Sequence, residues 1–203
     1  MALDSMQEIL ERMEAENKPF WQVVQDTDRE ERQVTAEASR EKMRATWQAM
    51  LESVTSYQGE RMSLSGLVGG DGERMRRYAR EGTPLSGAYL QEVIATALCV
   101  GESNACMRKI VAAPTAGACG VLPAVLVPLY QSGQAEEEEI LQALYVAAGI
   151  GAVVGYRACI AGGRRRLSGG DAAPAERHWR RCAERLCGRF RRSAGRSCRG
   201  RWR

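Results

Sequence analysis

The sequence predicts an all-α body followed by an arginine-rich tail that is expected to be disordered. Apolar side chains recur on one face of a helix, at Met43, Trp47, Met50, Leu51 and Val54. No segment alternates apolar and polar residues with the period of two that marks a half-buried strand. At residue 163 the composition changes, because residues 163–203 hold fourteen Arg, no Lys and only two branched aliphatic side chains.

The composition suits one domain with a core, since the chain has 203 residues of which 44% are hydrophobic. The formal net charge of +4 is unevenly distributed along the chain. The tail has fourteen Arg and three acids, whereas the body has 15 basic and 22 acidic residues. The N-terminus resembles no signal peptide, and no apolar run is long enough for a membrane span. We therefore expect a cytoplasmic protein without a membrane segment, whose seven Cys are thiols or metal ligands rather than disulfides.

The first elements are expected to be two amphipathic helices. Residues 4–24 predict a helix that Lys18 and Pro19 interrupt. Residues 26–28 (Asp-Thr-Asp) offer an N-cap, from which a second helix is expected to run to Val54. The apolar stripe of this second helix is best interpreted as a core-packing face, which could also cover a partner subunit.

The middle of the chain is expected to alternate loops and helices. Residues 57–72 are rich in Gly and Ser and predict a loop, and residues 73–80 predict a short polar helix. Ser86 is the expected N-cap of a helix that runs to about Cys99, and residues 101–120 are expected to form the next loop.

Two apolar helices are expected after this loop. They cover residues 121–130 and 140–156, and four acids at residues 136–139 precede the second helix, where the helix dipole favours them. Gly149 and Gly151 each weaken a helix by ~1 kcal/mol relative to Ala, so we expect them to serve close approach to a helix or ligand.

The loop at residues 114–120, Pro-Thr-Ala-Gly-Ala-Cys-Gly, is small-residued and uncharged and lies between apolar segments. Two glycines and a proline predict an unusual backbone path. Two interpretations remain open: a tight turn between buried helices, or a loop whose backbone N–H groups bind a carboxylate or phosphate at the start of the next helix.

Several segments, taken in order, resemble the alpha chain, or catalytic domain, of the iron-sulfur-dependent L-serine dehydratases. They are residues 62–71 (MSLSGLVGGD), 104–128 (NACMRKIVAAPTAGACGVLPAVLVP), 147–152 (AAGIGA) and 158–162 (ACIAG). The resemblance covers about residues 1–162, and the run PTAGACGVLPAVL is highly specific. Arg157 departs from the pattern, because the family has an Asn there.

The resemblance implies conversion of L-serine to pyruvate and ammonia, with a 4Fe-4S cluster as Lewis acid and a beta chain as partner. It implies a substrate-binding shell of Ser63, Ser65, Gly66, Asn104, Thr115, Ala116, Gly117, Cys119 and Gly120. No residue can be named as the catalytic base.

The family's cluster ligands are cysteines in a Gly-Cys-Gln-x-Glu segment and in two later segments, and none of these segments occurs here. We therefore assign no metal ligand and expect the chain to be inactive alone. Cys99, Cys106 and Cys159 are expected to be buried thiols.

Residues 163–203 are expected to be a frame-shifted continuation of the 1–162 domain. Codons for residues 164–171 can be chosen so that reading one base later gives Gly-Gly-Gly-Cys-Gln-Ala-Glu, the family segment. A second hypothesis is a non-catalytic helical interaction protein whose Arg-rich tail binds nucleic acid, which the tail would in any case do without sequence preference. A metal site of His178 with the tail cysteines is a weaker alternative, because their spacing is poor for zinc.

Overall fold

The computed structural model describes residues 5–82, 86–113 and 115–157, and these contain seven α-helices, one 3-10 helix and no strand. The prediction of an all-α body is therefore confirmed. Contacts divide the chain into two compact units, Met1–Ile160 and Ala161–Arg203. The second unit lies outside the described residues, and with it lie the predicted disorder and nucleic-acid binding of the tail.

Helix α1 (Met6–Glu16) and helix α2 (Phe20–Arg32) are separated at Pro19, which confirms the predicted interruption. The Ser5 side chain accepts a hydrogen bond from the Glu8 N–H and caps α1, and Asn17 ends it in the left-handed conformation.

The predicted start of the second helix at residues 26–28 is wrong, because this segment lies inside α2. Asp26 does not cap a helix but pairs with Lys18 and Arg29, each at 2.8 Å. Helix α2 ends where Gln33 takes a left-handed conformation, and Thr35 caps helix α3 (Ala36–Thr55) by accepting from Ala38 N–H.

Helix α4 spans Asp71–Glu81 and begins at Gly70, whose φ of 83° favours glycine. Helix α5 spans Ala88–Ala105 and is longer than predicted, so Gly101 lies in a helix rather than in a loop. Gly87 is its N-cap, and Ser86 instead accepts a hydrogen bond from Gln91 Nε2 at 2.7 Å.

The 3-10 helix η1 spans Ala116–Ala118, and helices α6 (Val121–Gln131) and α7 (Glu137–Arg157) follow. The predicted acidic start of α7 is confirmed for its first turn. Two of these acids also join α7 to α3, since Glu137 accepts from Arg44 at 3.0 Å and Glu138 pairs with Arg40.

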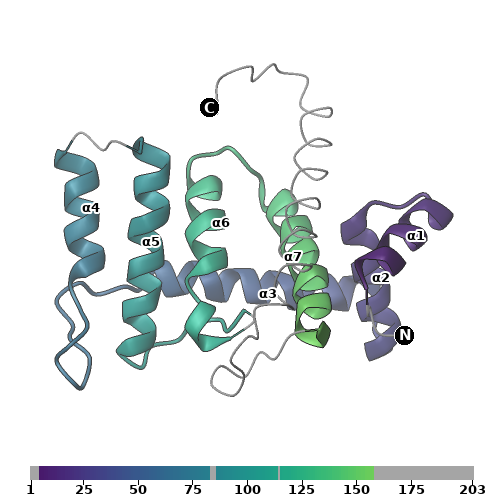
Figure 1. Cartoon of the computed structure of the whole chain (residues 1–203), viewed down its shortest axis with the longest axis horizontal. Coiled ribbons are helices and arrows are strands. Elements are labelled where there is room, and N and C mark those ends of the chain that lie inside the picture. The colour runs from purple at the N-terminus through teal and green to yellow at the C-terminus, as the bar shows by residue number, and fades with distance from the viewer. Residues whose placement is uncertain (1–4, 83–85, 114, 158–203) are drawn as a thin grey trace, which may run out of the picture. The chain divides into compact units, whose positions relative to one another are not determined.

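Figure 1 shows α4, α5 and α6 side by side, with α3 running across α5, α6 and α7. The core lies where these helices meet, and its buried members are Trp47, Met50, Val54, Val100, Cys119, Leu126, Val127, Ile140, Leu141 and Leu144. The stripe predicted on α3 is therefore a core face, and Trp47 packs edge-on against Tyr130 with ring centroids 5.6 Å apart.

Helix α7 packs against α2 and α3. A Cβ atom at Gly149 would lie 2.5 Å from Val24 Cγ2, so the predicted close approach is confirmed there, whereas a Cβ at Gly151 would meet nothing within 4 Å. The expectation that no apolar run is long enough for a membrane span is wrong on length. Among the described residues, α7 is long and apolar enough over Glu137–Gly155 to cross a membrane, by length and composition alone. Core helices of globular proteins have the same property, and Ile140 and Leu144 belong to the core here.

Candidate functional site

The segments predicted to bind substrate lie at the same end of the α4–α5–α6 layer. Figure 1 shows that α4 begins, α5 ends and α6 begins at this end. Asn104 Nδ2 donates to Ala116 O at 3.1 Å, which joins α5 to the 115–120 loop. Residues 62–70 are held beside the end of α5 by a neighbouring contact, in which Cys106 Sγ lies 3.7 Å from Arg61 O. We call this end, with residues 62–70, Asn104 and residues 115–120, the candidate site.

The loop of residues 62–70 is closed by its own hydrogen bonds. Ser63 N–H donates to Val68 O at 2.8 Å, and Ser63 Oγ accepts from Val68 N–H at 3.1 Å. Ser63 is buried and its hydroxyl also lies 3.1 Å from Ser65 Oγ, so Ser63 shapes the loop and Ser65 is the hydroxyl on its exposed side. Gly66 is exposed and has a φ of 70°, a conformation that favours glycine.

Asn104 lies in the last turn of α5 and is half-buried. Its amide group donates to the carbonyl of Ala116, twelve residues further along the chain. Asn104 therefore holds the 115–120 loop against α5, in addition to any contact with substrate.

The backbone of the 115–120 loop is a single 3-10 turn, in which Ala118 N–H donates to Thr115 O at 3.0 Å. The unusual backbone path predicted from its glycines is absent, since Gly120 has a φ of −80° and Gly117 shows no positive φ. Ala116 and Gly117 are exposed, and a Cβ at Gly117 would meet only Thr115 Oγ1, at 3.9 Å. The small side chains leave this face of the loop open.

Cys119 and Gly120 have packing roles that the sequence did not distinguish from binding roles. Cys119 is buried in the core cluster, and this burial raises the pKa of its thiol. A Cβ at Gly120 would lie 3.0 Å from the backbone oxygen of Ala97 on α5, so glycine permits the close approach of α5 and α6. The Cys119 side chain is therefore not available to a ligand, and Gly120 has no side chain to offer.

The start of α6 gives the candidate site a partial positive charge. Its N-cap, Gly120, makes no side-chain capping hydrogen bond, and its first turn has no acidic residue. The first N–H groups of a helix have no partner inside the helix and favour an anion. This arrangement suits the carboxylate of a small ligand.

Glu102 is a residue that the sequence reasoning missed. It lies in α5, is buried, and accepts hydrogen bonds from the N–H groups of Asp71 and Gly72 and from the Tyr57 hydroxyl. The available signal was a carboxylate within a helix that is otherwise mostly apolar.

The cysteines of the described residues do not fit a 4Fe-4S cluster. Cys99, Cys106 and Cys119 are buried free thiols, as predicted for Cys99 and Cys106, and no three His, Cys, Asp or Glu side chains in this part of the chain could hold a metal together. Burial raises the pKa of the Cys99 thiol to about 11. Cys159 lies outside the described residues.

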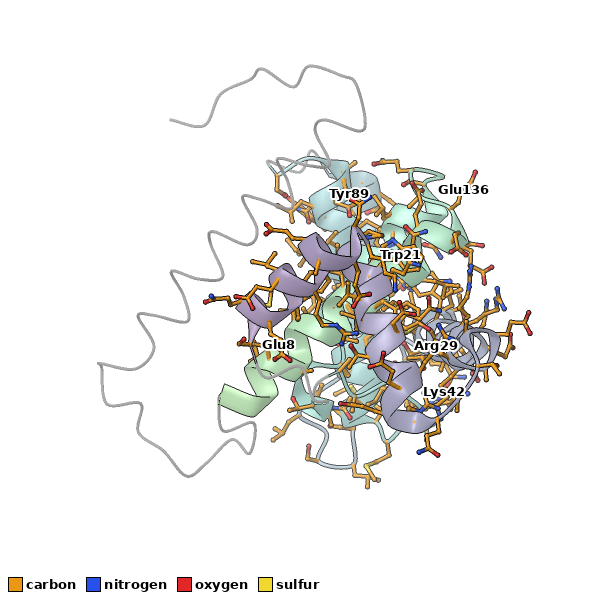
Figure 2. All side chains as sticks on the ribbon, turned by 90° about the vertical axis from the view of Figure 1, so that its right-hand side faces the viewer. Glu8, Trp21, Arg29, Lys42, Tyr89 and Glu136 are labelled. Carbon is orange, nitrogen blue, oxygen red and sulfur yellow. The ribbon has the colours of Figure 1, made fainter. Side chains whose placement is uncertain are left out.

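A cavity of about 430 Å³ lies elsewhere in the described residues, between α2, α3 and α7. Lys42, labelled in Figure 2, lies at its rim and is exposed. None of the predicted substrate-binding residues lines it.

Comparisons with known proteins identify the family to which this chain is similar. The family model of the serine dehydratase alpha chain matches residues 15–164. A probable L-serine dehydratase alpha chain of Bacillus subtilis is 36% identical over 120 residues, which cover 59% of this chain and 38% of that protein. The L-serine dehydratase alpha chain of Peptoniphilus asaccharolyticus is 29% identical over 161 residues, which cover 79% of this chain and 55% of that protein.

A third relative, the L-serine dehydratase TdcG of Escherichia coli, is 42% identical over 67 residues, 32% of this chain and 15% of that protein. No solved structure matches the chain. The matched part of the chain thus spans about half or less of the length of these relatives. Because the family model matches well over half of the residues, the chain belongs to the serine dehydratase alpha chain family.

Proposed function

We propose that this chain supplies the serine-binding part of a cytoplasmic L-serine dehydratase. The reaction removes water from L-serine to give 2-aminoacrylate, which tautomerises to an imine and hydrolyses to pyruvate and ammonia. The observation that carries the proposal is the placement of three family segments at the same end of the α4–α5–α6 layer, where α6 begins without a side-chain cap. Its support is membership of the family.

The chain's own residues are suited to holding the substrate. The start of α6 and the open face at Ala116 and Gly117 offer backbone N–H groups to the serine carboxylate. The exposed hydroxyl of Ser65 can donate to the same anion or accept from the ammonium group. Holding both groups fixes the orientation of the bond that must break.

The elimination also requires a base for the α-hydrogen and a Lewis acid for the leaving hydroxide. A 4Fe-4S cluster would supply the Lewis acid, but the described cysteines do not fit one, so its ligands would have to come from other residues. We therefore propose that the chain is inactive alone and works with a beta chain, a partner that the alpha-chain names of its relatives imply.

Serine binding tests this proposal without requiring turnover. We expect L-serine to shift the amide NMR signals of residues 65–66 and 115–122 of the 203-residue chain. Gly117→Val places a branched side chain on the open face and should weaken the affinity for serine about tenfold or more. Gly151→Val is the matched control, since a Cβ there meets nothing within 4 Å and lies on α7.

Unchanged serine affinity in Gly117→Val would show that the 115–120 loop is only a turn between helices. Signal shifts confined to the cavity between α2, α3 and α7 would move the binding site there and overturn the proposal.

A further inference from the structure

Glu102 is a carboxylate in a buried position, where a charged group costs free energy. Glu102 is 5% exposed and lies in the last two turns of α5. Its neighbours on the buried side of this helix include Cys99 and Cys106. A buried charge persists only when hydrogen bonds replace the water that it has lost. The partners of Glu102 therefore indicate what the residue is for.

The hydrogen-bond partners of the Glu102 carboxylate are the first two residues of α4 and Tyr57, which lies between α3 and α4. Oε1 accepts from Asp71 N–H at 2.6 Å and from Gly72 N–H at 3.2 Å, and Oε2 accepts from the Tyr57 hydroxyl. Gly70, the N-cap of α4, has no side chain to cap this helix. Glu102 therefore caps α4 from a different helix, and its negative charge also faces the positive end of the α4 dipole.

The contact depends on a very close approach of the two helices. A Cβ atom at Gly72 would lie 2.7 Å from Cys99 Sγ and 3.0 Å from Tyr57 Oη. Glycine at this position thus lets the start of α4 reach α5. The hydrogen bonds from the start of α4 to Glu102 and the absence of a side chain at Gly72 together hold Asp71 against α5.

The loop of residues 62–70 is consequently fastened to α5 near both of its ends. Glu102 holds the residues that follow the loop, and Cys106 Sγ lies against Arg61 O just before it. A Cβ at Gly69 would lie 2.5 Å from the same Arg61 oxygen, so the two ends of the loop touch. The exposed hydroxyl of Ser65 is placed by this frame.

We propose that Glu102 is a positioning residue, which holds the Ser63–Ser65 turn of the candidate site in its binding geometry by capping α4 from α5. The inference rests on the proposed serine-binding function. Glu102 is not the base of the reaction, because both of its oxygens already accept hydrogen bonds inside the protein.

The protonation state of the Tyr57 hydroxyl agrees with the positioning role of Glu102. Burial, and then the hydrogen bond to Glu102, raise the pKa of the Tyr57 hydroxyl well above its ordinary value. The phenol therefore keeps its proton and remains a donor to the carboxylate throughout the neutral pH range.

Hydrogen exchange of the full chain tests whether Glu102 holds the loop. In Glu102→Gln and Glu102→Ala, the amides of residues 63, 66, 68, 71 and 72 should exchange about tenfold or more faster, while amides of α2 and α7 keep their rates. Glu81→Gln is the control, because this exposed glutamate lies at the other end of α4. Unchanged loop exchange in both Glu102 variants overturns the proposal, and so does equal acceleration in every helix, which would mean a merely structural residue.

A double-mutant cycle then tests whether the loop is the route by which Glu102 acts on serine. Glu102→Gln should weaken serine affinity in the wild-type chain but have little further effect in Ser65→Ala. Fully additive losses would overturn the positioning role. If the wild-type chain binds no serine, the proposed function falls, and loop exchange alone decides whether Glu102 anchors the turn.

Discussion

Single side chains in this protein show how one residue type can serve different purposes. Cys99, Cys106 and Cys119 are buried thiols, and Cys119 belongs to the core even though it lies within the specific 114–120 motif. Gly117 is open to solvent, whereas Gly120, three residues later, is packed against the α5 backbone. This motif therefore combines solvent-exposed residues with residues that fit the loop to the helices behind it.

Alkaline pH should destabilise the protein through Cys99. Burial raises its pKa from 9.0 to about 11, so the proton is held more tightly in the folded state than in the unfolded state. This contribution to the free energy of unfolding is complete below pH 9 and is lost as the pH rises through about 11. We expect urea unfolding to show a steeper loss of stability above pH 9 for the wild type than for Cys99→Ala.

The comparison with Cys99→Ala removes the effect of other groups that titrate in the same range, because both proteins share them. Equal pH dependence of the two proteins would show that Cys99 is as easily ionised when folded as when unfolded.

At the scale of helices, the sequence predicted the elements better than their boundaries. The core face of α3 and the break at Pro19 were predicted correctly, because residue spacing and proline determine local structure. The boundary between α2 and α3 was misplaced because Asp26 has the residue type of a cap but is used in ion pairs with Lys18 and Arg29.

Tertiary contacts explain what the sequence could not predict about the candidate site. The three segments share one end of the helical layer because α4, α5 and α6 lie side by side, which the sequence did not predict, and the binding roles of their residues stay a prediction. The role of Glu102 follows only from its contacts with Asp71 and Gly72, which are about thirty residues away in sequence. Capping of one helix by another leaves no local pattern to detect.

The packing of α7 on α2 should be sensitive to one methyl group. Gly149→Ala would place a Cβ atom 2.5 Å from Val24 Cγ2 and 3.0 Å from Phe20 Cε1, so the helices must separate. We expect a loss of about 1–3 kcal/mol in the free energy of unfolding, measured in urea.

Gly151→Ala is the matched change in the same helix, with nothing within 4 Å of the new Cβ. It should raise stability by up to about 1 kcal/mol, because alanine favours a helix over glycine. Similar effects of the two substitutions would mean that α2 and α7 do not approach as closely as described.

For the molecule as a whole, the matches with relatives leave much of their length without a counterpart here, since they cover 38% and 55% of two of them. Within the residues described, no group of three or more His, Cys, Asp or Glu side chains could hold a metal. The frameshift explanation of residues 163–203 remains a prediction.

The DNA sequence checks that explanation directly. Read one base later after codon 162, it should encode Gly-Cys-Gln-Ala-Glu and two later cysteine segments, and the repaired protein should bind a cluster and form pyruvate. The 203-residue chain, treated with iron and sulfide without oxygen, should show neither the visible absorption of a 4Fe-4S cluster nor pyruvate formation. A stoichiometric cluster in the unrepaired chain would contradict this prediction.

Helix α3 has a consequence for how the sequence can change over time. It contacts α2, α5, α6 and α7, and the side chain of Trp47 at its centre is fully buried. A substitution at Trp47 or Met50 therefore disturbs several interfaces at once and can be compensated only by simultaneous changes in several helices. The exposed side of the same helix, at residues such as Glu41 and Gln48, carries no such constraint. Amino-acid substitutions in α3 should accordingly accumulate on its exposed side, so that variable and invariant positions recur with the period of the helix.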